Sequence, residues 1–223
     1  MTRLVALIAA LALIAGAPVA SAQAPAAECP STQVLDAAPN LVRAGDEAAL
    51  AQFIETAPCH YWITFYFAAE HLFNVGRKDE AARWFYVAQL RGRTVALLDP
   101  GSTPSTIQAL QFVIGQPINV EAGADQTKMV EAIDWAIAWD RQNPMQLESI
   151  RRVGRQVAPG VMQHSFDPSR PIPTERISPA PTQSQLDEAY VEQRNGIAGL
   201  RMAIASIPPE EWIRQRQANG LER

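Results

Sequence analysis

The chain has 223 residues, of which 48% are hydrophobic, 7% aromatic and 19% charged, and its formal net charge is −4. This balance excludes a highly charged disordered chain, a collagen-like repeat and a membrane protein with many spans. It also argues against a nucleic-acid binder, because phosphate contacts favour a basic chain. Two cysteines are too few for a four-thiolate zinc site. We therefore expect no nucleic-acid partner, no metal and no cofactor.

Residues 1–22 have the layout of a secretory signal peptide. Arg3 gives a positive start, residues 4–15 are uniformly apolar or small, and Ala20 and Ala22 stand at the −3 and −1 positions before Gln23. The apolar run is shorter than the roughly 20 residues that a spanning helix needs, although an uncleaved anchor is the alternative. We expect cleavage before Gln23, no membrane span afterwards, and a periplasmic or secreted protein.

The two cysteines, Cys29 and Cys59, are expected to form a disulfide, since thiols usually pair in an oxidising compartment. Closing this loop stabilises a fold by roughly 3–4 kcal/mol in the chain-entropy model. It also ties an Ala/Pro-rich start to the first residues of an aromatic helix. The alternative is a reactive thiol, for which a Cys-x-x-Cys spacing is missing.

Apolar residues recur at helical spacing throughout the chain, whereas strand-like alternation is scarce. The expected fold class is therefore all-α, built from antiparallel helical hairpins or an irregular helical bundle. In chain order, we expect helices at 46–56 with Asp46 as N-cap, 58–75 closed by Gly76, 79–98, 105–114 opened by a capping box at Ser105, 125–142 with Asp125 as N-cap, 144–157 opened by Pro144, 183–206, and after Pro208 and Pro209.

This pattern divides the chain into a helical domain at residues 28–158, a proline-rich linker at 159–182 and a C-terminal helical arm at 183–223. Six prolines fall between residues 159 and 181, where little can be buried. Two arrangements of the arm remain open at this point. It either folds back on the helical domain or reaches a partner.

Ten of the sixteen aromatic residues lie between residues 53 and 86, so the helices in this region should dominate the core. Successive helical residues point about 100° apart, and five aromatic residues between 61 and 67 therefore cannot share one side. Either this helix is covered on several sides, or an aromatic flank is exposed as a groove for a ligand or peptide. The candidate partner-binding residues are Trp62, Tyr66, Phe67, Trp84 and Tyr86.

The segment from Phe65 to Ala88 resembles a tetratricopeptide or Sel1-like helical hairpin, and the resemblance covers about residues 62–90. It implies an antiparallel helix pair and a scaffold that binds peptides or partner proteins. The family's proline after the second helix is missing, and no second copy follows at a period of about 34 residues. We therefore expect a single hairpin within a helical domain. The matching positions hold Phe65, Ala69, Leu72, Gly76, Ala81, Phe85 and Ala88.

Candidate catalytic chemistry is sparse, and no catalytic residue is assigned. His60 and His71 are separated by roughly 16 Å along a helix, too far to share a metal. The nucleophile elbow, the phosphate loop and the dinucleotide fingerprint are all absent from the sequence. A buried Glu70 with a raised pKa would suit a general acid, whereas a surface Glu70 would lie near Arg77 or His71.

The preferred function is therefore an exported, non-enzymatic interaction module that binds a protein or peptide in the periplasm. A narrower version is a protector that neutralises a delivered toxin. Two alternatives remain, namely a secreted hydrolase of cell-wall or glycan substrates with Glu70 as the acid, and a structural periplasmic protein without a discrete ligand.

Overall fold

The structure is a computed structural model that describes residues 29–98, 103–147, 150 and 181–221. Every regular element in these residues is a helix, which confirms the all-α class. The signal peptide predicted at 1–22 and almost all of the linker predicted at 159–182 lie outside the described residues. The elements are α1 (Thr32–Arg43), α2 (Glu47–Glu55), the 3-10 turn η1 (Ala57–Cys59), α3 (Trp62–Asn74), α4 (Lys78–Leu98), α5 (Thr103–Leu110), the π-helical turn η2 (Gln111–Gly115), α6 (Gln116–Ala122), α7 (Gln126–Gln142), α9 (Gln183–Ala205) and α10 (Pro209–Ala218).

Helix boundaries that depend on local capping agree with the sequence prediction. Asp46 accepts a hydrogen bond from Ala49 N at the start of α2, and Asp125 accepts two from the first turn of α7. Gly76 ends the α3 region with φ +85°, a left-handed conformation that glycine adopts at low cost. Caps of this kind can be predicted from the sequence because the donor and the acceptor are within a few residues of each other.

The prediction was wrong at several other boundaries. The helix expected from residue 58 begins only at Trp62, and α6 was not predicted. Helix α1 was missed, because Pro39 lies inside it and proline normally interrupts a helix. The capping box predicted at Ser105 does not open α5, which already begins at Thr103. Pro144 does not restart a helix either, since residues 143–146 are not helical. The rest of the predicted 144–157 helix lies almost entirely outside the described residues.

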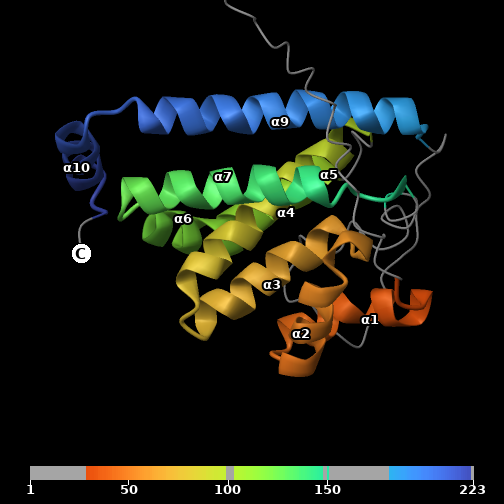
Figure 1. The fold of residues 1–223 in the computed structure, drawn as a ribbon. Helices are drawn as coiled ribbons and strands as arrows, with labels where there is room; N and C mark the ends of the chain where they lie inside the picture. Colours follow the sequence, from red (N-terminus) through yellow and green to blue (C-terminus); the bar gives the residue numbers. More distant parts are fainter. Residues whose placement is uncertain (1–28, 99–102, 148–149, 151–180, 222–223) are drawn as a thin grey trace, which may run out of the picture.

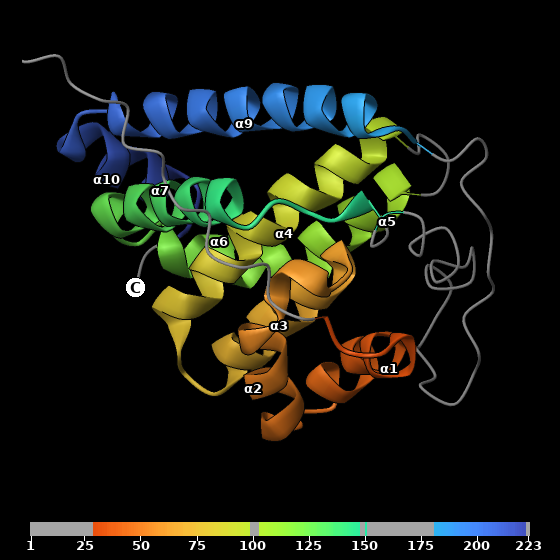
Figure 2. The same ribbon diagram turned by 45° about the vertical axis from the view of Figure 1, so that its right-hand side comes forward.

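The helices form layers, as both views of the ribbon show (Figures 1 and 2). Helix α9 lies along one side of the molecule and packs on α4 and α7. Helix α3 packs against the side of α4 that faces away from α9. Helices α1 and α2 lie on the opposite side of the molecule from α9. The core therefore lies between α3, α4 and α7, with α9 as a cover.

The C-terminal arm folds back on the helical domain, which was one of the two arrangements left open. Gln126 Nε2 donates to the carbonyls of Ile204 and Ile207, at 2.6 and 2.8 Å. On α10, Trp212 Nε1 donates to Gly123 O at 2.9 Å. These bonds tie the C-terminal arm to the start of α7 and to the residue after α6.

None of the helices within the described residues combines the length and the apolar character needed to cross a bilayer.

Glycine at position 115 is required by close packing. A Cβ there would lie 2.6 Å from two atoms of the Phe85 ring, whereas a Cβ on Gly196 of α9 would meet nothing within 4 Å. We predict that Gly115→Ala lowers the free energy of unfolding by about 1–3 kcal/mol, because the ring has to shift. The matched variant Gly196→Ala should raise it by about 0.5–1 kcal/mol. Urea denaturation measures both, and equal effects would contradict this packing.

Candidate functional site

All five candidate partner-binding residues lie in the core. Their exposed fractions are 0% for Trp62 and Tyr66, 1% for Tyr86, 2% for Phe67 and 5% for Trp84. Helix α3 is covered by α1, α4 and η2, so the alternative in which it is covered on several sides holds. In this conformation the five side chains are not available to a partner.

Trp84 is at the centre of an aromatic cluster that joins three helices. Its ring meets Phe53, Trp135 and Trp139 edge-on, with centroid distances of 5.4, 5.2 and 5.0 Å. Trp135 and Trp139 stack on each other at 6.2 Å. Edge-to-face pairs of this kind stabilise a protein beyond the burial of their apolar area. The aromatic residues therefore stabilise the core.

A buried ionic network lies beside this cluster, and the sequence analysis missed it. Arg91 and Asp140 are both 0% exposed, and Arg91 Nε lies 3.2 Å from Asp140 Oδ1. Arg194 Nη2 lies 2.9 Å from the other carboxylate oxygen. The Arg91 guanidinium is 4.8 Å from the ring centroids of both Phe65 and Trp139. Two cations thus share one carboxylate, and aromatic faces provide further stabilisation.

The network also fixes the non-helical segment 143–146. Arg91 Nη2 donates to Asn143 O, and Met145 N donates to the Tyr190 hydroxyl at 2.8 Å. The Arg194 guanidinium lies 4.5 Å from the Tyr190 ring centroid, and burial raises the pKa of Tyr190. One set of contacts therefore joins α4, α7, this segment and α9. Its role in the described residues is to position these elements.

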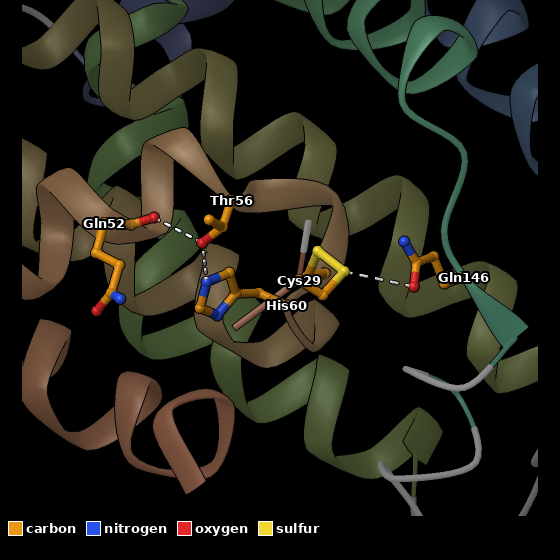
Figure 3. Close-up of a disulfide and its surroundings, with 6 residues drawn as sticks. Cys29, Gln52, Thr56, His60 and Gln146 are labelled. Carbon is orange, nitrogen blue, oxygen red and sulfur yellow. Dashed lines mark hydrogen bonds between the residues drawn. A yellow bond between two sulfur atoms is a disulfide. The ribbon is translucent and has the colours of Figure 1, made fainter. Parts of the chain in front are cut away.

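His60 is a buried neutral imidazole next to the Cys29–Cys59 disulfide (Figure 3). The Thr56 hydroxyl donates to Gln52 O at 2.7 Å and lies 2.9 Å from His60 Nε2. Because that hydroxyl has only one proton, His60 Nε2 must be the donor in the second bond. Burial, and secondarily the charge of Arg91, lowers the pKa of His60 from 6.5 to about 4.

Glu70, the candidate acid of the hydrolase alternative, lies beneath the end of α1. Arg43 Nε is 3.9 Å from Glu70 Oε2. The predicted neighbours are engaged elsewhere, since His71 binds Glu47 at 2.9 Å and Arg77 binds another carboxylate. Burial raises the pKa of Glu70, and the charge of Arg43 opposes this rise. The general-acid role stays a prediction.

A cleft of about 250 Å³ opens between the first turns of α4 and α7 and the end of α6. Its lining carries both signs of charge. Lys78 lies 3.2 Å from Glu121, and Lys128 lies 3.1 Å from Asp79, while Asp125 caps α7. The whole lining holds three cationic and four acidic side chains, a formal net charge of −1, and two opposite pairs are already bonded to each other, so the cleft offers little charge for the recognition of an ion.

The outer surface of α5, η2 and α6 has a different character, because residues 103–120 contain no charged residue. Phe112 and Val113 are 74% and 62% exposed, and Phe112 is the most exposed large apolar side chain in the described residues. We call this surface the Phe112 face. It consists of the exposed residues Pro104, Ser105, Gln108, Phe112, Val113, Gln116 and Pro117.

The exposed residues Phe112 and Val113 lie in the π-helical turn η2, between α5 and α6. Ile114 and Gly115 are buried, and Gly115 lies against the Phe85 ring. A π turn contains an extra residue compared with an α-helical turn, and such turns often occur at functional sites. Phe112 and Val113 occupy the outer side of this widened turn. The signal available in the sequence was the uncharged run with an adjacent Phe-Val pair.

No protein-family model, curated protein or solved structure matches this chain. The resemblance of residues 62–90 to a tetratricopeptide or Sel1-like hairpin therefore stays a prediction. The Cys29–Cys59 disulfide is present, with Cα atoms 5.6 Å apart, and such a bond is compatible with an exported protein.

The buried network predicts a large effect of removing its carboxylate. We expect Asp140→Ala to lower the free energy of unfolding by about 3–5 kcal/mol, because it leaves two cations without a counter-charge. The matched variant Asp134→Ala removes the partner of Arg201 at the surface and should have a far smaller effect. Guanidinium denaturation followed by tryptophan fluorescence measures both. Similar losses in the two variants would contradict the role given to Asp140.

His60 predicts a specific sensitivity to acid. Its pKa is about 4 in the folded protein and 6.5 when unperturbed, so between these values the unfolded chain binds the proton more tightly. The contribution of neutral His60 to the free energy of unfolding is therefore fully present above about pH 6.5. It is lost as the pH falls towards about 4, and it amounts to at most about 3 kcal/mol. The variant His60→Gln should lack this component, which denaturation curves at several pH values would reveal. If the free energies of unfolding of the wild type and of His60→Gln change in parallel with pH, His60 makes no such contribution.

Proposed function

We propose that this chain is an exported, non-enzymatic helical protein that binds a protein partner through the Phe112 face. The observation that carries the proposal is the pair Phe112 and Val113, which are 74% and 62% exposed within a segment, residues 103–120, that holds no charged residue. Large exposed apolar side chains that lie together on a surface mark interaction sites.

The composition of the Phe112 face supports a protein partner. The centres of protein interfaces are depleted of charged residues and enriched in aromatic ones, and residues 103–120 combine both properties. Helix α9 also exposes apolar residues, Val191 and Met202 among them. There, however, Glu192 and Arg201 lie close by in the sequence, so the exposed surface of α9 is mixed.

The chemistry of the face also limits the partner. Residues 103–120 offer a charged partner surface no counter-charge, and burying an unpaired charge against Phe112 is unfavourable. The partner should therefore present an uncharged apolar surface, with Gln108 and Gln116 available for neutral hydrogen bonds. The toxin-neutralising protector is the narrower form of this proposal, in which the partner is a toxin.

The test begins with a photo-crosslinking amino acid at position 113, which should capture the partner, and with the same probe at position 191 as the control site. The captured protein is then purified, and its affinity is measured by calorimetry. We predict that Phe112→Asp weakens binding about 30-fold or more, as expected for an interface hot spot that receives a charge. The matched variant Val191→Asp, also on an exposed apolar residue, should bind like the wild type.

Two results would contradict the proposal. One is a partner that crosslinks equally from positions 113 and 191. The other is a purified partner whose affinity is unchanged by Phe112→Asp while circular dichroism shows an intact helical fold.

A further inference from the structure

Helix α1 covers the outer side of α3 and also touches α2 (Figures 1 and 2). Its buried apolar anchors are Leu35, Ala38 and Val42, at the i, i+3 and i+7 positions of one helix face. Val42 belongs to the contiguous hydrophobic core, whereas Leu35 and Ala38 are buried outside it. Helix α1 therefore lies on the core as a separate layer, in the manner of an amphipathic helix in a groove.

The polar contacts of α1 lie at both ends of this groove. The Tyr61 hydroxyl donates to Asp36 Oδ1 at 2.6 Å. Near the other end, the Arg43 guanidinium lies 5.1 Å from the Phe67 ring centroid and Arg43 Nε lies 3.9 Å from Glu70 Oε2. The groove thus recognises an acidic residue near the start of a helix and a basic residue at its end.

Helix α1 is weak by its own sequence. It has 12 residues, Pro39 lies inside it, and Ser31 makes no capping hydrogen bond with its side chain. A helix of this length is marginal in isolation, and an internal proline removes one of its backbone hydrogen bonds. Its position therefore depends on its contacts with α3 and on the covalent attachment of its start.

That attachment is the Cys29–Cys59 disulfide, which joins the residues just before α1 to η1 (Figure 3). Cys59 is buried, whereas Cys29 is partly exposed. The side chain of Gln146 touches the Cys29 sulfur, with Oε1 at 3.5 Å. One end of the bond therefore belongs to a partly exposed residue, and exposed disulfides are the labile or regulatory ones.

We propose that α1 is a redox-latched cover over a helix-binding groove on α3. A dithiol reductant supplies two electrons and two protons, the Cys29–Cys59 bond becomes two thiols, and the reductant becomes a disulfide. Residues 29–43 then leave the groove, and Tyr61, Phe67 and Glu70 become accessible. The partner is an amphipathic helix with the same pattern as α1, an acidic residue near its start and a basic residue at its end.

This groove is separate from the Phe112 face, and the inference does not depend on the proposed function. A protein that lacks a partner for the Phe112 face can still open at α1, and the reverse also holds. The two proposals therefore fail independently.

The first test is hydrogen exchange of the chain from residue 23 to residue 223, with and without dithiothreitol. Mass spectrometry counts the free thiols in the same samples. Reduction should lower the protection of amides 32–43 about tenfold or more, as expected for local unfolding. Amides of α4 and α9 should keep their protection. The variant Cys29→Ser should behave like the reduced protein and show no response to dithiothreitol.

Two outcomes of this test would overturn the proposal. If amides 32–43 keep their protection after reduction, the disulfide is not a latch. If every helix loses protection together, the disulfide holds the whole fold and not α1 alone.

The second test asks whether the uncovered groove receives a helix. A fluorescent peptide of residues 31–44 is the probe, and Cys29→Ser combined with Leu35→Asp and Val42→Asp keeps the chain's own α1 out of the groove. By anisotropy, the peptide should bind this variant about tenfold or more tightly than the oxidised wild type, in which α1 occupies the groove. A peptide carrying Val42→Asp is the matched control and should not bind. If the peptide binds both proteins equally, or binds neither, the proposal that this groove receives a helix is wrong.

Discussion

The fold depends on a single buried carboxylate. Asp140 is the counter-ion for Arg91, which is fully buried beside the rings of Phe65 and Trp139, and for Arg194 from the C-terminal helix α9. Desolvated charges are costly, and they are tolerated only where geometry and hydrogen bonds compensate. The position of α9, the course of segment 143–146 and the orientation of α7 relative to α4 all follow from this arrangement. Removing one partner of such a pair leaves an uncompensated buried charge, which is strongly unfavourable.

Local features of the fold could be predicted from the sequence. The N-caps at Asp46 and Asp125 and the left-handed Gly76 involve residues that are neighbours along the chain. The disulfide also followed, because only one pairing of two cysteines exists. Helix α1 could not be predicted in this way. Its internal proline opposes a helix, and packing against α3 is what overrides that preference.

The functional surface was harder to predict than the fold. The dense aromatic segment allowed two arrangements, a helix covered on several sides or an exposed groove, and the rings form the core because α3 is covered on several sides. Sequence composition does not tell whether an aromatic side chain is covered. The ionic network gave no local signal either, since Asp140 is 49 residues from Arg91 and 54 from Arg194. The Phe112 face had a signal in its uncharged run, but the sequence does not tell which apolar residues of that run are exposed.

The position of α9 has a consequence for the order in which the chain folds. Leu186, Tyr190 and Ile204 fill the core from a helix that is synthesised after α4 and α7. Until α9 has been made, the apolar sides of α4 and α7 that receive these residues have no cover, and Asp140 lacks its second arginine. A nascent chain of this design therefore cannot complete its core before α9 is available.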